Sequence, residues 1–214
     1  ANPNCSTAQL LMALKPIHDA VKIKFLNIAT YQAVSGTGKA ALEELHNQIY
    51  FKESENQPSV YPKQIAFNVI PQCDIFLDNN FTKEEMKLTW ETHKILDPNI
   101  QVQATCVRVP VFNGHSEAVF FRVSKEISRE EIIKILDKAP GLKVLDDPSS
   151  GGYPTPFENA TDTEDVYVGR IRSQSLDDDC WISMWIVADN VYGKGAALNA
   201  VQICEELLNV GSVK

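Results

Sequence analysis

Four of the five predicted strands of this chain come in two successive pairs with no helix inside either pair. This order limits the folds that the chain can adopt. Alternating or β-branched apolar runs, typical of strands, span residues 21–33, 100–109, 117–123, 166–171 and 181–188. Apolar residues at helical spacing occur at 5–18, 39–50, 82–96, about 129–136 and about 195–208. Strands joined without a crossover helix favour antiparallel pairing. We therefore expect an α+β fold with one large mixed or antiparallel sheet and helices on one face.

Local signals mark several boundaries. The runs that match a capping box are Thr82-Lys83-Glu84-Glu85 and Ser128-Arg129-Glu130-Glu131. Pro16 is expected to interrupt the first helix. Residues 51–80 contain three prolines and few helix signals, so we expect them to be irregular. Residues 147–163 are predicted to be a loop that leaves and re-enters one domain.

Size, charge and cysteine content exclude several classes of protein. The 214 residues suffice for one large domain. The net charge is −8 and no Lys/Arg cluster is present, so we expect no nucleic-acid partner. No apolar run reaches the length of a membrane span, so no membrane partner is expected. The five cysteines are scattered and lack metal-ligand spacing, which predicts reduced thiols, no metal site and a cytoplasmic protein.

Cys5 is the only cysteine placed where a helix begins. It lies in Asn2-Pro3-Asn4-Cys5-Ser6-Thr7, which is rich in helix-capping residues. Unpaired N–H groups and the positive end of the helix dipole favour the thiolate there, and the thiolate is the nucleophilic form. The alternative is a capped helix that carries a small buried residue.

His115 follows the turn signal Asn113-Gly114, which separates two strand-like runs. This position just beyond a hairpin tip or loop would suit a general base beside a thiol, or an ordinary histidine of a surface loop. The other histidines are expected to be solvated on helices: His18, His46 and His93.

Arg108 ends a strand whose alternate residues are apolar. Its guanidinium needs an anionic partner, either an internal Asp or Glu or the carboxylate of a ligand, and the sequence leaves both open. Gln32 ends another strand, next to the loop Ser35-Gly36-Thr37-Gly38, whose backbone N–H groups could hold an anion or an amide. Glu91 and Lys94 share one helix face, as solvated surface pairs do.

Taken together, these runs resemble the aspartate-β-semialdehyde dehydrogenase family along essentially the whole chain. The runs that carry the resemblance are Asn4-Cys5-Ser6-Thr7, Thr30-Tyr31-Gln32-Ala33-Val34-Ser35-Gly36-Thr37-Gly38, Phe67-Asn68-Val69-Ile70-Pro71, Trp90-Glu91-Thr92-His93-Lys94-Ile95, Ala104-Thr105-Cys106-Val107-Arg108-Val109-Pro110-Val111, Gly114-His115-Ser116-Glu117 and Lys194-Gly195-Ala196-Ala197-Leu198-Asn199-Ala200.

The resemblance implies a glyceraldehyde-phosphate-dehydrogenase-like C-terminal domain. No G-x-G-x-x-G follows a strand here, so we expect the N-terminal Rossmann domain to be absent from this chain, which would then be a piece of a longer protein. Residues 1–193 would form the catalytic and dimerisation domain. Residues 194–214 would form a C-terminal helix that packs on the missing dinucleotide-binding domain.

The resemblance also implies a role for each site residue. Cys5 would be the nucleophile, His115 the general acid/base, and Gln32 the side chain that orients a thioester. Arg108 would bind the substrate α-carboxylate and Glu91 the α-amino group.

Further implied contacts concern phosphate and cofactor. Lys94 would bind phosphate, while Ser35, Gly36 and Asn190 would contact the nicotinamide end of NADP. The family's usual Asp-Asn-aliphatic-Arg-Lys-Gly is one residue longer here, with Tyr192 and an additional Gly193.

The implied reaction is the NADP-dependent reductive dephosphorylation of L-aspartyl 4-phosphate to L-aspartate 4-semialdehyde, and its reverse. It belongs to the route to lysine, threonine and methionine, and a homodimer would catalyse it. The chain alone is expected to be inactive because the cofactor domain is missing. We also expect Cys5 to react selectively, with Cys106 and Cys204 slow because they are buried.

Two alternatives stay open. One is a non-catalytic dimerisation module. The other is an enzyme similar to acetylglutamyl-phosphate reductase, although Glu91 and Arg108 suit a substrate with a free amino group and a carboxylate.

Overall fold

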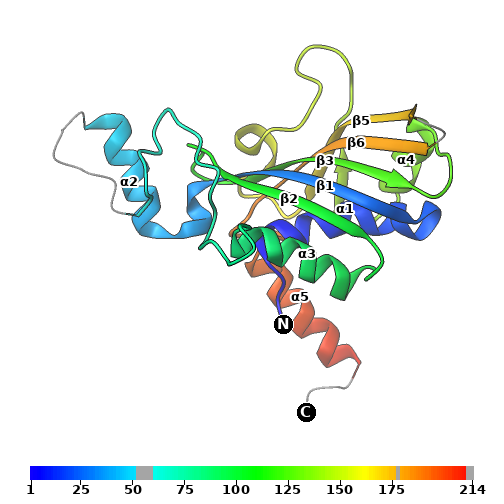
Figure 1. The fold of residues 1–214 in the computed structure, drawn as a ribbon, viewed down its shortest axis with the longest axis horizontal. Coiled ribbons are helices and arrows are strands. Elements are labelled where there is room, and N and C mark those ends of the chain that lie inside the picture. The colour runs from blue at the N-terminus through cyan, green and yellow to red at the C-terminus, as the bar shows by residue number, and fades with distance from the viewer. Residues whose placement is uncertain (52–59, 177–178, 211–214) are drawn as a thin grey trace.

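The computed structural model describes residues 1–51, 60–176 and 179–210, and a mixed sheet of six strands forms its centre (Figure 1). The strands lie in the order β2-β1-β3-β6-β5-β4. Their bounds are β1 Ile23–Gln32, β2 Gln101–Arg108, β3 His115–Val123, β4 Leu142–Val144, β5 Val166–Leu176 and β6 Asp179–Ala188. β1 pairs with β2, and β4 with β5, in parallel; the other neighbours are antiparallel. The predicted mixed sheet is confirmed.

The helices lie mainly on one side of this sheet. They are α1 Cys5–Val21, α2 Lys39–Tyr50, α3 Lys83–Ile95, α4 Arg129–Leu136 and α5 Ala197–Asn209, with short turns of helix at Val34–Thr37 and Pro156–Ala160. Figure 1 shows α1 and α3 beneath the strands, while α2 projects beyond one end of the sheet. Both predicted capping boxes are present, at Thr82 and Ser128.

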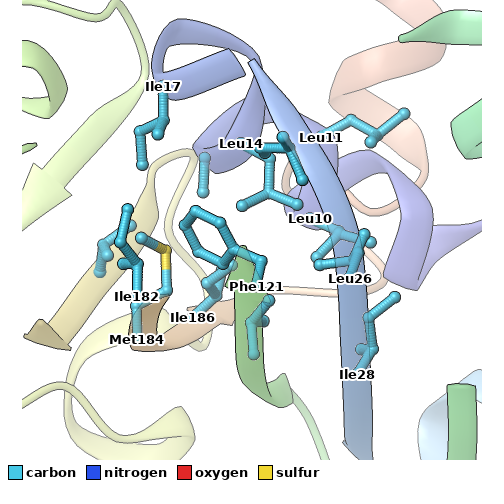
Figure 2. Close-up of a cluster of buried hydrophobic side chains, with 14 of the residues drawn as sticks. Leu10, Leu11, Leu14, Ile17, Leu26, Ile28, Phe121, Ile182, Met184 and Ile186 are labelled. Carbon is cyan, nitrogen blue, oxygen red and sulfur yellow. The ribbon is translucent and has the colours of Figure 1, made fainter. Parts of the chain in front are cut away.

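The main core fills the space between α1 and the sheet (Figure 2). Every second residue of a strand points to the same face, so apolar side chains at alternate positions line the side that α1 covers. The fully buried side chains there include Leu10, Leu14 and Ile17 of α1, and Leu26, Ile28, Phe121, Ile182 and Ile186 of the strands.

Two expectations about α1 are wrong. The helix continues through Pro16 to Val21, because one missing backbone bond costs less than the burial of the apolar face on which Ile17 and Val21 lie. His18 is buried rather than solvated: its Nδ1 accepts from the Ile23 N–H at 3.2 Å and its Nε2 lies 3.5 Å from Asp97 Oδ2. Burial lowers the pKa of His18.

Of the two settings expected for Asn113-Gly114, a hairpin tip or a loop, the structure shows a loop. β2 and β3 are not neighbours, because β1 lies between them and pairs with both. Residues 109–114 therefore form a longer loop over the end of β1. Gly114 has φ +88°, and a Cβ there would lie 2.8 Å from the Pro156 side chain, so the loop needs glycine at this point.

Residues 147–163 pack on the sheet, as expected for a loop within one domain: the Trp185 indole donates to the Pro154 carbonyl at 3.0 Å. α5, in contrast, contributes no buried residue within the described part of the chain. Cys204 lies on it and is exposed, so the expectation that this thiol is buried is wrong, whereas Cys106 is fully buried. Within the described ranges, no helix is both long and apolar enough to cross a membrane.

Phe121→Ala should lower the free energy of unfolding by about 3–5 kcal/mol, because it leaves a cavity at the centre of the main core. Urea unfolding followed by circular dichroism measures this loss. Phe157→Ala is the control: Phe157 is 89% exposed, and its loss should cost less than about 0.5 kcal/mol. Equal losses would contradict the assignment of this core.

Candidate active site

The N-terminus of α1 presents Cys5 as its first residue. The Asn4 side chain caps the helix, accepting from the Ser6 N–H at 3.0 Å and the Thr7 N–H at 3.3 Å. Asn4 is itself held from α3: its backbone N–H donates to Glu91 Oε2 at 2.9 Å and its Nδ2 to Glu84 Oε1 at 2.8 Å. The predicted helix start at Cys5 is confirmed.

Three predicted site residues lie side by side at one end of the sheet, where β1 and β2 finish and β3 begins. Gln32 pairs with Arg108 across β1 and β2, and Tyr31 pairs with Ser116 across β1 and β3, so the register brings His115 next to Gln32 on its other side. All three residues are buried, and their side chains form hydrogen bonds on the side of the sheet that the helices cover. The row thus joins positions that are far apart in the sequence.

The Gln32 amide connects this row to the nucleophile helix. Its Nε2 donates to Ser6 Oγ at 3.0 Å and to Glu84 Oε1 at 3.2 Å. Ser6 follows Cys5 directly. The amide is therefore fixed beside the first turn of α1.

Ala33 links Arg108 and His115 through its backbone. Its carbonyl accepts from Arg108 Nη1 at 2.7 Å, and its N–H donates to His115 Nδ1 at 3.1 Å. Since burial and the Arg108 charge hold the pKa of His115 well below its usual range, the ring is neutral. Nδ1 accepts a bond, so the proton is on Nε2, which has no partner within the described residues.

Because Gly36 has no side chain, space remains beside the side chains of Arg108 and His115. A Cβ at this position would lie 3.0 Å from Arg108 Nη1 and 3.1 Å from His115 Nε2. Next to it, Ser35 Oγ accepts from Asn190 Nδ2 at 3.0 Å, and Asn190 Oδ1 accepts from the Gly114 N–H at 2.9 Å. The residues that the resemblance assigns to the cofactor therefore lie together at the same end of the sheet.

The buried guanidinium of Arg108 has no carboxylate partner. Arg108 is 6% exposed, and no ion pair joins it to an acid among the residues that the structure describes. Of the two partners considered from the sequence, the internal Asp or Glu is thus not found. A buried cation without a counter-charge is costly unless an anion joins it.

The prediction that Cys5 is ionised by the helix terminus is wrong for this structure. Burial, with a smaller contribution from Glu84, raises the pKa of the Cys5 thiol to about 11. The Ser6 N–H and Arg108 lower it, as expected of a helix start, but by less. The thiol is therefore protonated at neutral pH.

Glu91 and Lys94 differ from the solvated pair that their spacing suggested. Glu91 is half-buried and accepts from Asn4, so it belongs to the site. Lys94 is exposed, and within the described chain no hydrogen bond or ion pair connects it to the other site residues.

The sequence reasoning missed two buried acids. Glu84 lies in the first turn of α3 and meets both Asn4 and Gln32. Glu117 lies on β3 two residues after His115 and is fully buried; burial raises its pKa well above the usual range, so it is uncharged. A signal for Glu117 was present, because it alternates with His115, Val119 and Phe121 on one face of a strand.

The comparisons with known proteins agree with this geometry. Residues 14–192 match the family model described as semialdehyde dehydrogenase, dimerisation domain. The chain belongs to this family. Its relatives include the aspartate-semialdehyde dehydrogenases of Legionella pneumophila, 52% identical over 97% of the chain, and of Aquifex aeolicus, 49% identical over 100%.

Solved structures of the family show the same fold. The aspartate semialdehyde dehydrogenase II of Vibrio cholerae, in complex with ASA, is 47% identical over 98% of the chain, with a TM-score of 0.91. The chain spans 60% of the Legionella relative, 63% of the Aquifex relative and 62% of the Vibrio structure. It thus corresponds to the C-terminal portion of the family's enzymes.

Glu117→Gln should remove a pH-dependent loss of stability. A carboxyl whose folded pKa is raised stabilises the fold below its unfolded pKa, about 4.5, and that stability is lost as pH rises toward the folded pKa. The unfolding free energy of the wild type should therefore fall relative to Glu117→Gln by up to about 1.4 kcal/mol per pH unit.

Urea unfolding of both proteins between about pH 5 and about pH 8 measures this difference. Glu43→Gln, at an exposed position on α2, is the control and should run parallel to the wild type. If Glu117→Gln also runs parallel, Glu117 is charged in the folded protein.

Proposed function

We propose that this chain is the catalytic and dimerisation portion of an NADP-dependent aspartate-semialdehyde dehydrogenase. The observation that supports this best is the buried Arg108, which lacks a carboxylate partner in the described chain and lies in one row with Gln32 and His115. Such a cation suits the carboxylate of an amino-acid substrate. Cys5, which lies beside this row at the start of α1, would provide the nucleophile.

In the biosynthetic direction, Cys5 Sγ would attack the acyl carbon of aspartyl phosphate; the C–O bond to phosphate would break, the thiol proton would leave with the phosphate, and a thioester would remain. NADPH, when bound, supplies the hydride that reduces the acyl carbon. The Nε2–H of His115 would donate a hydrogen bond to the oxyanion formed in this step, and the C=O bond would re-form as the C–S bond breaks, so that the semialdehyde leaves and the Cys5 thiolate takes up a proton. The Gln32 amide would orient the thioester.

The two ends of the substrate require opposite charges. Arg108 would bind the α-carboxylate and Glu91 the α-amino group, while the exposed Lys94 would meet the phosphate as it arrives. Ser35, Gly36 and Asn190 fit the nicotinamide end of the cofactor, because the position without a side chain at Gly36 opens toward His115 Nε2.

The rest of the cofactor would be bound by a domain outside this chain. Within residues 1–193 no glycine fingerprint of a dinucleotide site occurs. Of the segment 194–214, the described helix α5 exposes Val201, Leu207 and Leu208 and buries nothing. We propose that α5 packs on that dinucleotide-binding domain.

A second copy of this chain would cover the face of the sheet opposite the helices, which the described residues 147–163 reach only at Trp185 and its neighbours. That face carries aromatic side chains: Phe120 stacks on Trp181 with ring centres 4.7 Å apart, and Tyr31 lies 5.5 Å from Trp185. A sheet face rich in aromatic residues and without a helical cover is typical of an interface between subunits. The family model is described as a dimerisation domain, which supports assembly through this chain.

The activity has a direct test. The chain should produce no NADPH from aspartate semialdehyde, phosphate and NADP, whereas its fusion behind the N-terminal portion of the Legionella relative should do so. In the fusion, Cys5→Ser should lower turnover by about 10³-fold or more, and Cys204→Ser, at an exposed position, should leave it unchanged. Equal turnover of acetylglutamate semialdehyde would favour the reductase alternative, and an inactive fusion would favour a dimerisation module.

The assembly is tested by sedimentation of the chain over a range of concentrations. We expect a dimer that Phe120→Glu converts to a monomer, because it places a charge on the aromatic face. Val201→Glu on α5, on the other side of the sheet, should remain dimeric. A wild-type monomer at all concentrations would rule out this interface.

A further inference from the structure

Glu84 is the point at which the nucleophile helix and the Gln32 amide are joined. A single oxygen, Oε1, accepts from Asn4 Nδ2 at 2.8 Å and from Gln32 Nε2 at 3.2 Å. Asn4 is the cap of α1 and precedes Cys5 directly. Three elements of the fold, α1, β1 and α3, therefore converge on one carboxylate.

The Glu84 side chain is only 9% exposed, yet both of its carboxylate oxygens have partners. Its second oxygen, Oε2, lies 3.1 Å from Lys87 Nζ, and the same ammonium contacts Asp74 Oδ2 at 3.0 Å. A buried carboxylate with an ammonium and two amide donors has its charge compensated and its lone pairs used. Its position is therefore fixed by three partners, Asn4, Gln32 and Lys87.

This charge also acts on the thiol. Apart from burial, Glu84 is the largest influence that raises the pKa of Cys5. Arg108 on β2 opposes it, and the Glu117 carboxyl on β3 adds to it. Glu91 faces the same helix start through the Asn4 N–H.

We propose that Glu84 is a positioning residue of this site, whose carboxylate fixes the Asn4 cap and the Gln32 amide beside Cys5. The proposal rests on the proposed function only in taking Cys5 as the nucleophile. Glu84 acts through Asn4 and Gln32, whose side-chain amides it binds.

Three variants of this chain distinguish the effect of the length of the Glu84 side chain from the effect of its charge. Glu84→Gln keeps an oxygen that can accept both amides but removes the charge, so Cys5 should react faster with iodoacetamide. Each unit by which its pKa falls should raise the rate near pH 8 about threefold, since tenfold more thiolate is partly offset by its lower nucleophilicity. Lys87→Gln leaves the Glu84 charge uncompensated and should slow the reaction. Peptide mass mapping separates Cys5 from the exposed Cys204.

Glu84→Asp keeps the charge but shortens the reach by one methylene, so it should release Gln32. The side-chain amide signals of Gln32 in ¹H–¹⁵N NMR spectra should shift in this variant and stay near their wild-type positions in Glu84→Gln. Glu43→Gln, which removes an exposed charge on α2, is the control for both readouts. The amide dispersion of the same spectra reports that each variant is folded.

The proposal is overturned if Glu84→Gln and Lys87→Gln leave the Cys5 rate within about 1.5-fold of wild type, or if Glu84→Asp leaves the Gln32 signals in place. Neither readout needs cofactor, substrate or turnover. A failed activity assay of the fusion would therefore count against the proposed function and leave this result standing.

Discussion

The pairing of β1 with both β2 and β3 is the constraint on which the site depends. Because the side chains of a strand alternate between two faces, a shift of one residue in either register would turn Arg108 or His115 away from the helices. The observed register places both beside Gln32 and leaves the backbone of Ala33 to bond with each. The core beneath, with Ile28 and Phe121 packed on α1, fixes that register through burial.

Burial also sets the charge state of the site. The thiol of Cys5 and the carboxyl of Glu117 are protonated, and His115 is neutral, because each charged form would lose its hydration. Glu84 has an ion-pair partner in Lys87, whereas Arg108 has none within the described chain. Among the described residues the site thus holds one guanidinium without a counter-charge, and this asymmetry is the basis of the proposal that it binds an anionic substrate.

Much of the secondary structure could be predicted from local signals. The capping residues Thr82 and Ser128 fix helix starts through bonds to their own neighbours, and alternating apolar residues mark the strands. The errors and the choice left open share a cause. Asn113-Gly114 suited a hairpin tip or a loop because strand order is not local, and His18 and Cys204 were misassigned because burial depends on what packs against a helix.

The sequence by itself determined the elements, the capped helix that begins at Cys5, and the set of residues whose order resembles a dehydrogenase family. Those features depend on neighbours within a few positions of the chain. Only the tertiary structure decided that Arg108 lacks a carboxylate partner among the described residues, that Glu84 joins Asn4 to Gln32, and that the Cys5 pKa is raised rather than lowered. Electrostatic energies depend on distance and on exclusion of water, and both are set by segments that meet only when the chain has folded.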